Sequence, residues 1–245
     1  MLSRSLQPIW EGMVHRRWTA EQLAAFQDKL SRFNLLANYT NAVRRAVLAH
    51  IAVWQENANQ KRPRELQGQE RYYKEAWFIQ PRSWWLENCI DLYRAGETAI
   101  GNVDVAGGHV TINQGAAGFD GMALDSETST MLQQPWWAGA SPSLVVFAQT
   151  AVNQAIIACA LERFRLDKGQ YPQNLDELIP QYLPSIPNDV VRGHPMFYQV
   201  TTNGLFILRS VGPNGIDDRN KPSSDDWLWT FPTNMMPVTK PTKGK

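Results

Sequence analysis

The stretch that decides the fold of this chain is ALERFRLDKGQYPQNLDELIPQYLPSIPND, residues 160–189. Gly169 is placed to take the left-handed conformation that ends a helix, and the proline that follows Tyr171 keeps that residue extended. Asn174 is placed to cap a second, short helix from Leu175 to Ile179, which has two acidic residues in its first turn. We therefore expect a long helix followed by a short return helix, whose leucine and isoleucine side chains fold back onto the long one.

Upstream of this stretch the sequence predicts the longest helix of the chain, from Ser141 to about Leu166. Its second residue is a proline, which is tolerated in a first helical turn because its missing N–H has no intrahelical partner there. Residues 128–161 contain no charged side chain, so a membrane span is one interpretation. Prolines and side-chain amides interrupt that run, and we expect instead a helix that is buried on several sides of a globular domain.

Downstream of the stretch, apolar residues no longer recur at helical spacing but at every second position. PMFYQV (195–200) and LFILRSV (205–211) flank Asn203-Gly204, which is a strong hairpin signal. DWLWTF (226–231) is predicted to be a third strand. The predicted fold class is therefore α+β: a helical N-terminal region followed by a long helix packed on a small antiparallel sheet.

The region before the long helix is mainly helical in its pattern. Thr19 and Gln22 form a capping box ahead of apolar residues at helical spacing, and Asn34 either breaks or bends that helix. A second periodic run covers residues 35–55. A third covers residues 71–93, with a break near Pro81 and Ser83 as the cap of its second half.

A glycine-rich segment separates these helices from the long one. It has seven glycines between Gly96 and Gly121. Valine and isoleucine alternate with polar residues on both sides of Gly107-Gly108, at positions 103, 105, 110 and 112, which predicts a small hairpin. An irregular loop over the helices is the alternative.

Composition excludes several classes of function. The chain has 245 residues, 43% hydrophobic and 19% charged, which is typical of a globular protein with a buried core. Its net charge is +1, so no nucleic-acid partner is indicated, and the short basic run Lys61–Arg64 is expected to be a solvated loop. Cys89 and Cys159 lie in apolar helical runs; a disulfide between them is one possibility, and they do not indicate a compartment. The N-terminus lacks the apolar core of a signal peptide.

Residues 144–231 resemble the globular domain of the major pseudopilins of type II secretion. The positions that carry the resemblance are Tyr171-Pro172, Leu175 with Leu178, Pro187 to Asp189, Gly193-His194-Pro195 and Ser210-Val211-Gly212. Those domains have a long helix ending in a Tyr-Pro turn, a short leucine-rich helix, and strands that follow in the order predicted here. The resemblance implies a pseudopilin-like fold and a place in the bacterial cell envelope or periplasm.

The pattern of the sequence, together with the resemblance, divides the chain into four parts. We expect a helical region (1–95), a glycine-rich connector (96–140), a pseudopilin-like α+β domain (141–232) and a mobile tail (233–245). Pseudopilins begin with a Gly-Phe-Thr-Leu-x-Glu prepilin-peptidase site, which this sequence lacks, and about 140 residues precede its long helix. It is thus more similar to envelope proteins that carry such a domain behind a helical region. If the chain is a fragment of a longer anchored protein, membrane association is expected as well.

The sharpest candidate site is the loop GPNGIDDRNKPSSDDW. It holds four carboxylates within ten residues, Asp217, Asp218, Asp225 and Asp226, and Ca²⁺ is bound by such oxygen ligands. In the major pseudopilins the corresponding loop binds calcium, so the resemblance implies a calcium site formed by these four residues. The alternative is a solvated acidic turn, in which Arg219 and Lys221 neutralise the acids or an aspartate bonds to the neighbouring backbone.

The four histidines have no paired metal spacing, and His50 is expected to pack in the core. The sequence favours a non-catalytic interaction or structural role, with a protein partner or self-association. The rival hypothesis is an enzyme of unknown class with a site in the glycine-rich segment 96–121, using His109 and Asp120 with Asp104 nearby. That hypothesis requires a pocket on which those side chains converge.

Overall fold

The computed structural model of the protein describes residues 5–59, 82–111, 142–218 and 225–232. The helices are α1 (Gln7–Val14), α2 (Ala20–Ser31), α3 (Leu35–Asn59), α4 (Arg82–Gly101), α5 (Pro142–Lys168) and the 3-10 helix η4 (Leu175–Leu178). The strands are β1 (Val103–Asp104), β2 (His109–Val110), β3 (Phe197–Val200), β4 (Phe206–Ser210) and β5 (Trp227–Trp229). The predicted α+β class, with a long helix and small antiparallel sheets, is confirmed.

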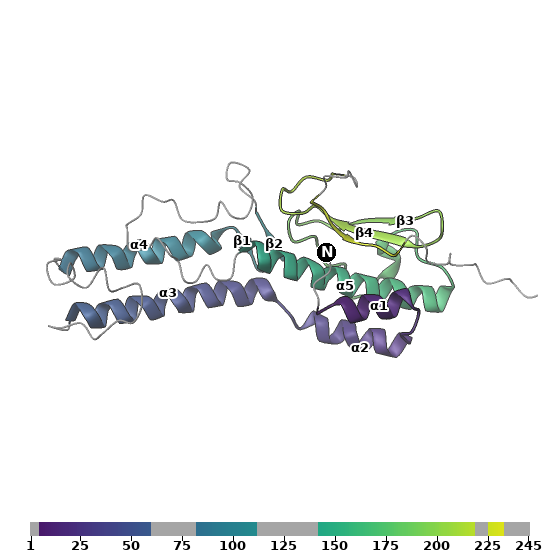
Figure 1. Cartoon of the computed structure of the whole chain (residues 1–245), viewed down its shortest axis with the longest axis horizontal. Coiled ribbons are helices and arrows are strands. Elements are labelled where there is room, and N and C mark those ends of the chain that lie inside the picture. The colour runs from purple at the N-terminus through teal and green to yellow at the C-terminus, as the bar shows by residue number, and fades with distance from the viewer. Residues whose placement is uncertain (1–4, 60–81, 112–141, 219–224, 233–245) are drawn as a thin grey trace, which may run out of the picture.

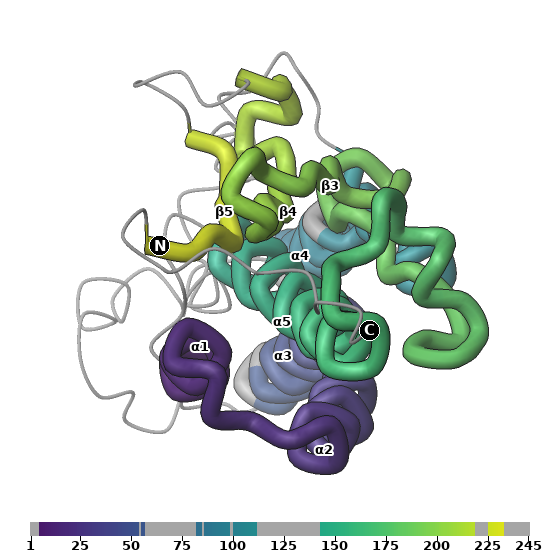
Figure 2. Tube along the Cα trace, turned by 90° about the vertical axis from the view of Figure 1, so that its right-hand side faces the viewer, coloured from purple at the N-terminus to yellow at the C-terminus, as the bar shows by residue number. Residues whose placement is uncertain are grey.

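Helix α5 is the centre of the molecule. The three-stranded sheet lies on one side of it, and α1 and α2 lie on the other (Figure 2). Its length and composition would allow it to cross a membrane, but 72% of its most apolar window is buried inside the protein. One core cluster joins Ile157 and Leu161 of α5 to Leu23 of α2 and to Leu208 and Trp229 of the sheet. The first two helices therefore share a core with the C-terminal elements.

The sheet has the antiparallel order β3-β4-β5. Phe197 pairs with Arg209, and Leu208 pairs with Trp229. Residues of β4 alternate between buried and partly buried, as expected for a strand with one face on the core. The hairpin predicted at Asn203-Gly204 forms, and Gly204 takes the left-handed conformation, with φ of 74°.

The turn after α5 is built largely as its sequence indicates. Gly169 has φ of 75° and donates its backbone N–H to the carbonyl of Arg165, 2.8 Å away. Asn174 accepts a hydrogen bond from the N–H of Glu177, which reaches back to the Asn174 backbone. The predicted short return helix forms as the four-residue 3-10 helix η4, one residue shorter than expected. Ile179 precedes a proline, which favours its observed extended backbone, and its side chain is 41% exposed rather than packed on α5.

A buried polar network fixes this turn to α5. The Tyr171 hydroxyl donates to Glu162 Oε2 at 2.7 Å. Arg165 donates to the same carboxylate through both Nε and Nη2, at 3.0 and 2.6 Å. The side chain of Glu162 is only 4% exposed and that of Arg165 is 12% exposed. A bidentate pair with an added hydroxyl donor is the arrangement that lets a carboxylate remain charged in a buried position.

Helix α1 was not expected from the sequence. It places Gly12 under the Trp18 indole, where a side chain would leave no room: a Cβ on Gly12 would lie 1.9 Å from Trp18 Nε1. The indole N–H of Trp18 donates to the carbonyl of Ile9 at 3.0 Å. Trp10 Nε1 donates to the carbonyl of Thr230 at 2.7 Å, which ties α1 to the end of β5.

Helices α2 and α3 follow the predicted pattern. The capping box formed by Thr19 and Gln22 is present. The predicted break near Asn34 is present, since α2 ends at Ser31 and Asn34 caps the start of α3 by accepting from the N–H of Ala37 at 2.9 Å. A second polar network ties α2 to α5 and the turn, because Arg163 Nη1 donates to Gln27 Oε1 at 2.7 Å and Gln27 is buried.

Helices α3 and α4 lie side by side and extend away from the sheet (Figure 1). Their shared core contains Tyr39, Val43, Val47, Leu92 and Ile100. Gly96 lies against α3, where a Cβ would approach Val47 Cγ2 to 2.6 Å. The connector was expected to begin at residue 96, but α4 continues to Gly101, and Gly96 is the residue that lets the two helices approach.

The hairpin predicted across Gly107-Gly108 forms, with strands of two residues each. Val103 pairs with Val110 and Asp104 with His109. The backbone N–H of Val110 donates to the carbonyl of Val190 at 2.7 Å, which docks the hairpin on the segment before β3. The first half of the predicted helix 71–93, the connector beyond residue 111 and the tail lie outside the described residues. Ser83 lies inside the first turn of α4, not ahead of it.

Candidate metal centre

The acidic loop leaves the sheet after β4 and returns to it at β5. A carboxylate outside the loop, that of Asp189, fixes its first end. Asp189 is fully buried, and its Oδ2 accepts from the N–H of Val211 at 3.1 Å while its Oδ1 accepts from the N–H of Val191 at 2.9 Å. The backbone just after β4 is therefore held against the turn that precedes β3.

The two ends of the loop approach each other closely at a glycine. Gly212 is buried, and a Cβ added to it would lie 2.1 Å from the backbone carbonyl oxygen of Asp225. Real Cβ atoms do not approach a backbone oxygen so closely, so the site requires glycine for its close approach rather than for an unusual φ. Asp225 and Asp226 are thereby placed beside the chain that leaves β4.

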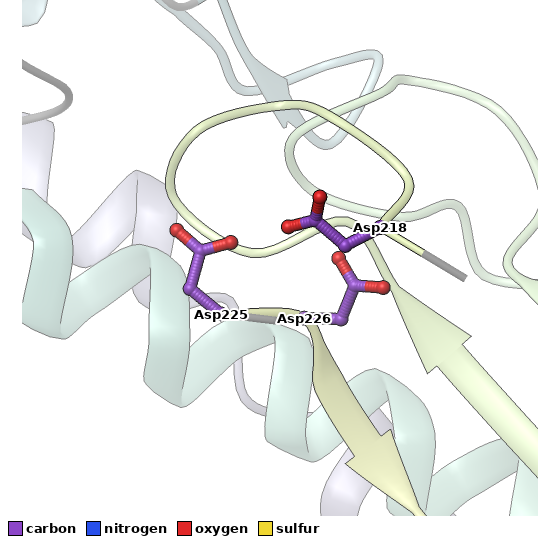
Figure 3. A group of neighbouring side chains, drawn as sticks. All are labelled: Asp218, Asp225 and Asp226. Carbon is purple, nitrogen blue, oxygen red and sulfur yellow. The ribbon is translucent and has the colours of Figure 1, made fainter. Parts of the chain in front are cut away.

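Three of the four predicted aspartates meet at this point. Asp218 comes from the outgoing chain, and Asp225 and Asp226 come from the segment just before β5 (Figure 3). One carboxylate oxygen from each lies within 4.8 Å of the other two. Like charges at this separation repel, so a cation between them would relieve the repulsion.

Asp217 is placed differently from the other three. Its Oδ1 lies 2.9 Å from Arg209 Nη2 on β4. Arg209 Nε is also 3.5 Å from Oδ2 of Asp226, whose side chain is fully buried. The guanidinium therefore partly neutralises the negative charge of the acidic loop from the side of the sheet. The carboxylate of Asp217 is turned toward this guanidinium.

Arg209 was not recognised as a site residue from the sequence. Its side chain is only 13% exposed, and its guanidinium lies 5.0 Å from the ring centroid of Phe197, its cross-strand partner. The sequence does contain a feature that marks Arg209 as a site residue. It is the one charged residue in the apolar run LFILRSV, and it precedes the four aspartates by only a few positions. Arg219 and Lys221, the cations expected to neutralise the loop, lie outside the described residues.

The arrangement has the chemistry of a hard-cation site. Carboxylate oxygens are the ligands that Ca²⁺ and Mg²⁺ prefer, and three aspartates with adjoining backbone carbonyls offer part of the six to eight oxygens that Ca²⁺ takes. Asp225 is exposed and Asp218 is partly buried, whereas the side chain of Asp226 is buried, so a bound ion would be open to solvent on the side of Asp225. The donor set by itself does not select calcium over magnesium.

The second candidate site is only partly described. His109 Nδ1 lies 3.4 Å from Asp104 Oδ2 across the β1–β2 hairpin, and Asp104 Oδ1 accepts from the N–H of Gly107 at 2.8 Å. The His109 ring lies against Gly193, where a Cβ would be 3.2 Å from the ring. Asp120, the other proposed member, lies outside the described residues. His50 is half-buried on α3, and burial lowers its pKa.

Both cysteines are free thiols in buried positions. Burial raises the pKa of Cys159 to about 12 and also raises that of Cys89. Thiolates, the reactive form, are therefore disfavoured at both positions at neutral pH.

Comparisons of the chain with protein-family models, with curated proteins and with solved structures find no match.

Proposed function

We propose that this protein is a non-catalytic interaction or structural component of the bacterial cell envelope, with a pseudopilin-like domain that calcium stabilises. The observation that carries the proposal is the meeting of Asp218, Asp225 and Asp226 in the loop between β4 and β5. This is the loop in which the sequence resemblance implies a calcium site. The elements around it also follow the order of that resemblance, from α5 through the Tyr171 turn and η4 to the three strands.

The electrostatics of the loop favour a weak site rather than a tight one. Arg209 already lies close to Asp217 and Asp226, so the charge that attracts a cation comes mainly from Asp218 and Asp225. Calcium sites with few ligand charges and partial exposure bind in the 10⁻⁴ to 10⁻³ M range typical of extracellular modules. Such a site fills where calcium is millimolar, which is consistent with a place outside the cytoplasm.

The buried polar groups of α5 and the two thiols have structural rather than reactive surroundings. Glu162, the most deeply buried carboxylate of α5, is bound by Arg165 and Tyr171 and holds a turn. The buried thiols have raised pKa values and disfavour a thiolate nucleophile. These groups stabilise the fold, and none of the contacts just named leaves a reactive group facing solvent.

Cell fractionation tests the proposed location directly. The full-length protein would be expressed with an epitope tag in its own host and followed into cytoplasmic, periplasmic and membrane fractions. We expect it in the periplasmic or membrane fraction, and accessible to protease once the outer barrier is opened. Recovery with a cytoplasmic marker and full protection from protease in intact spheroplasts would contradict the proposal.

A further inference from the structure

The three clustered aspartates lie beyond the part of the sheet that strand pairing fixes. Pairing of β4 with β5 ends at Ser210 and Trp227. Asp218, Asp225 and Asp226 lie past that pair, so among the described residues no strand pair sets their positions. The ligands of a metal ion are oriented by contacts with residues that do not bind the ion, and here such contacts have to come from other elements.

The outgoing end of the loop is held by Asp189. This side chain is fully buried in the turn before β3, and it accepts hydrogen bonds from three backbone N–H groups. Its Oδ2 accepts from Val211 at 3.1 Å, and its Oδ1 accepts from Val191 at 2.9 Å and from Arg192 at 3.4 Å. One carboxylate thus joins the first residue after β4 to a turn that lies about 20 residues earlier in the chain.

The returning end of the loop is held by Gln154 on α5. Nε2 of this buried amide donates to the backbone carbonyl of Trp227 at 2.7 Å. Trp227 directly follows Asp226 in the chain, so the bond fixes the backbone next to one member of the cluster to the central helix. Both ends of the loop are therefore fixed by buried polar side chains that belong to other elements.

The contact of Asp189 reaches the cluster through one glycine. Gly212 directly follows Val211, and the backbone carbonyl oxygen of Asp225 lies where a Cβ of Gly212 would be. A shift of Val211 would therefore also shift Gly212 relative to Asp225. Calcium affinity depends on such positions, because the ligand oxygens have to lie about 2.3–2.6 Å from the ion.

Asp189 itself is not placed to bind the ion. Both of its oxygens face backbone N–H groups, and the carboxylate oxygens that lie within 4.8 Å of one another belong to Asp218, Asp225 and Asp226. Any effect of Asp189 on metal binding therefore has to act through the backbone that it holds.

We propose that Asp189 is a positioning residue for the candidate metal centre, and that its bonds to Val211 and Val191 set how tightly the loop binds calcium. The inference deepens the calcium-stabilised domain proposed above and rests on it. Loss of a residue that orients metal ligands costs about 10- to 100-fold in metal affinity. By linkage, a bound ion in turn stabilises the bonds that Asp189 makes.

A calcium titration of the ¹⁵N-labelled full chain, followed by its amide NMR signals, tests the inference with Asp189→Asn. The amide keeps the shape of the side chain, but its NH₂ group donates, so the N–H of Val211 or that of Val191 loses its acceptor. We expect the dissociation constant for calcium to rise at least about 10-fold. The spectrum without calcium shows whether the variant is folded.

The matched control is Glu162→Gln, which also changes a buried carboxylate to its amide. Glu162 lies eight residues, or about 12 Å, further along α5 than Gln154, which holds the loop. We expect this variant to be less stable than the wild type but to bind calcium with the same dissociation constant. The comparison separates a change in the metal centre from a general loss of stability.

A second measurement uses the wild-type protein alone. Calcium should slow the hydrogen exchange of the Val211 amide, because the ion stabilises the bond from this N–H to Asp189. The amide of Leu23 on α2, which donates to the carbonyl of Thr19, should be slowed less. This measurement decides the question if Asp189→Asn does not fold.

Two results would overturn the inference and leave the proposed function intact. The first is a wild type that binds calcium no more tightly than Asp189→Asn, or than Asp189→Asn and Glu162→Gln by the same factor. The second is bound calcium that slows the exchange of Val211 no more than that of Leu23. A wild-type protein whose amide signals do not respond to calcium overturns both the inference and the calcium-stabilised domain.

Discussion

The buried carboxylate of Glu162 holds the turn that follows α5. We expect its removal to lower the free energy of unfolding substantially. The carboxylate accepts three hydrogen bonds, two from Arg165 and one from the Tyr171 hydroxyl. In Glu162→Ala the guanidinium, which is 12% exposed, and the buried hydroxyl both lose their acceptor. Removing one partner of a buried ion pair costs about 3–5 kcal/mol.

The slight exposure of Arg165 lets water solvate part of the freed charge, so we take the lower end, about 3 kcal/mol. For a chain of this size that corresponds to a fall in Tm of about 6–12 °C. Glu162→Gln keeps the shape and one acceptor oxygen, and should lose less than Glu162→Ala. Thermal unfolding followed by circular dichroism at pH 7 measures both.

The control is the exposed pair Asp28–Arg32 on α2, whose side chains are 62% and 72% exposed. A surface pair contributes about 0–1 kcal/mol, so Asp28→Ala should shift Tm by no more than a few degrees. If Glu162→Ala shifts Tm no further than Asp28→Ala does, the network does not hold the turn and the reasoning is refuted.

Three further predictions concern other parts of the structure. In Gly212→Ala the new Cβ would meet the backbone carbonyl of Asp225 and should displace that residue. The Tm of this variant, measured by calorimetry, should therefore be lower than that of the wild type. An unchanged Tm would contradict the close approach. Burial raises the pKa values of the Tyr171 and Tyr198 phenols, so the unfolded state loses these protons first. Stability from both groups should be complete below their ordinary pKa of about 10 and should be lost as pH rises above it. Urea unfolding at pH 8 and pH 11 should show a smaller alkaline loss in Tyr171→Phe than in wild type, and equal losses contradict this. Cys159 should not react with a thiol reagent at pH 7.5 unless the protein is unfolded, and rapid native labelling counts against its burial.

Local signals in the sequence predicted most of the elements. The capping box of Thr19 and Gln22, the helix end at Gly169 and the hairpin at Asn203-Gly204 depend on residues within four positions of one another, and all are present. What the sequence missed depends on distant contacts. Helix α1 is short, and the bond from Trp10 to the carbonyl of Thr230 joins residues 220 positions apart.

In the candidate site, too, local sequence predicts some features, while others depend on contacts between distant residues. The acidic composition of the loop identified the carboxylates, but spacing alone did not separate Asp217 from the other three. That separation comes from Arg209, which reaches the loop across the sheet. The close approach at Gly212 is likewise a property of the folded loop and has no signal in the local sequence.

The stability of the acidic loop in calcium is the most direct test of the proposed function. Tm would be measured in EDTA and in about 10 mM calcium for wild type, Asp218→Asn, Asp225→Asn and Asp217→Asn, with magnesium as a further comparison. For a dissociation constant of about 10⁻⁴ to 10⁻³ M, calcium should add about 1.4–2.7 kcal/mol to the free energy of unfolding. Asp217→Asn is the matched control, because Asp217 pairs with Arg209 and lies outside the cluster.

The account predicts that calcium raises Tm of the wild-type protein by about 3–11 °C. That rise should disappear in Asp218→Asn and Asp225→Asn, and it should persist in Asp217→Asn even if the Tm of that variant is lower in EDTA. A wild-type protein whose Tm is the same in calcium and EDTA, or a rise that survives in Asp218→Asn and Asp225→Asn, would contradict a calcium-stabilised domain.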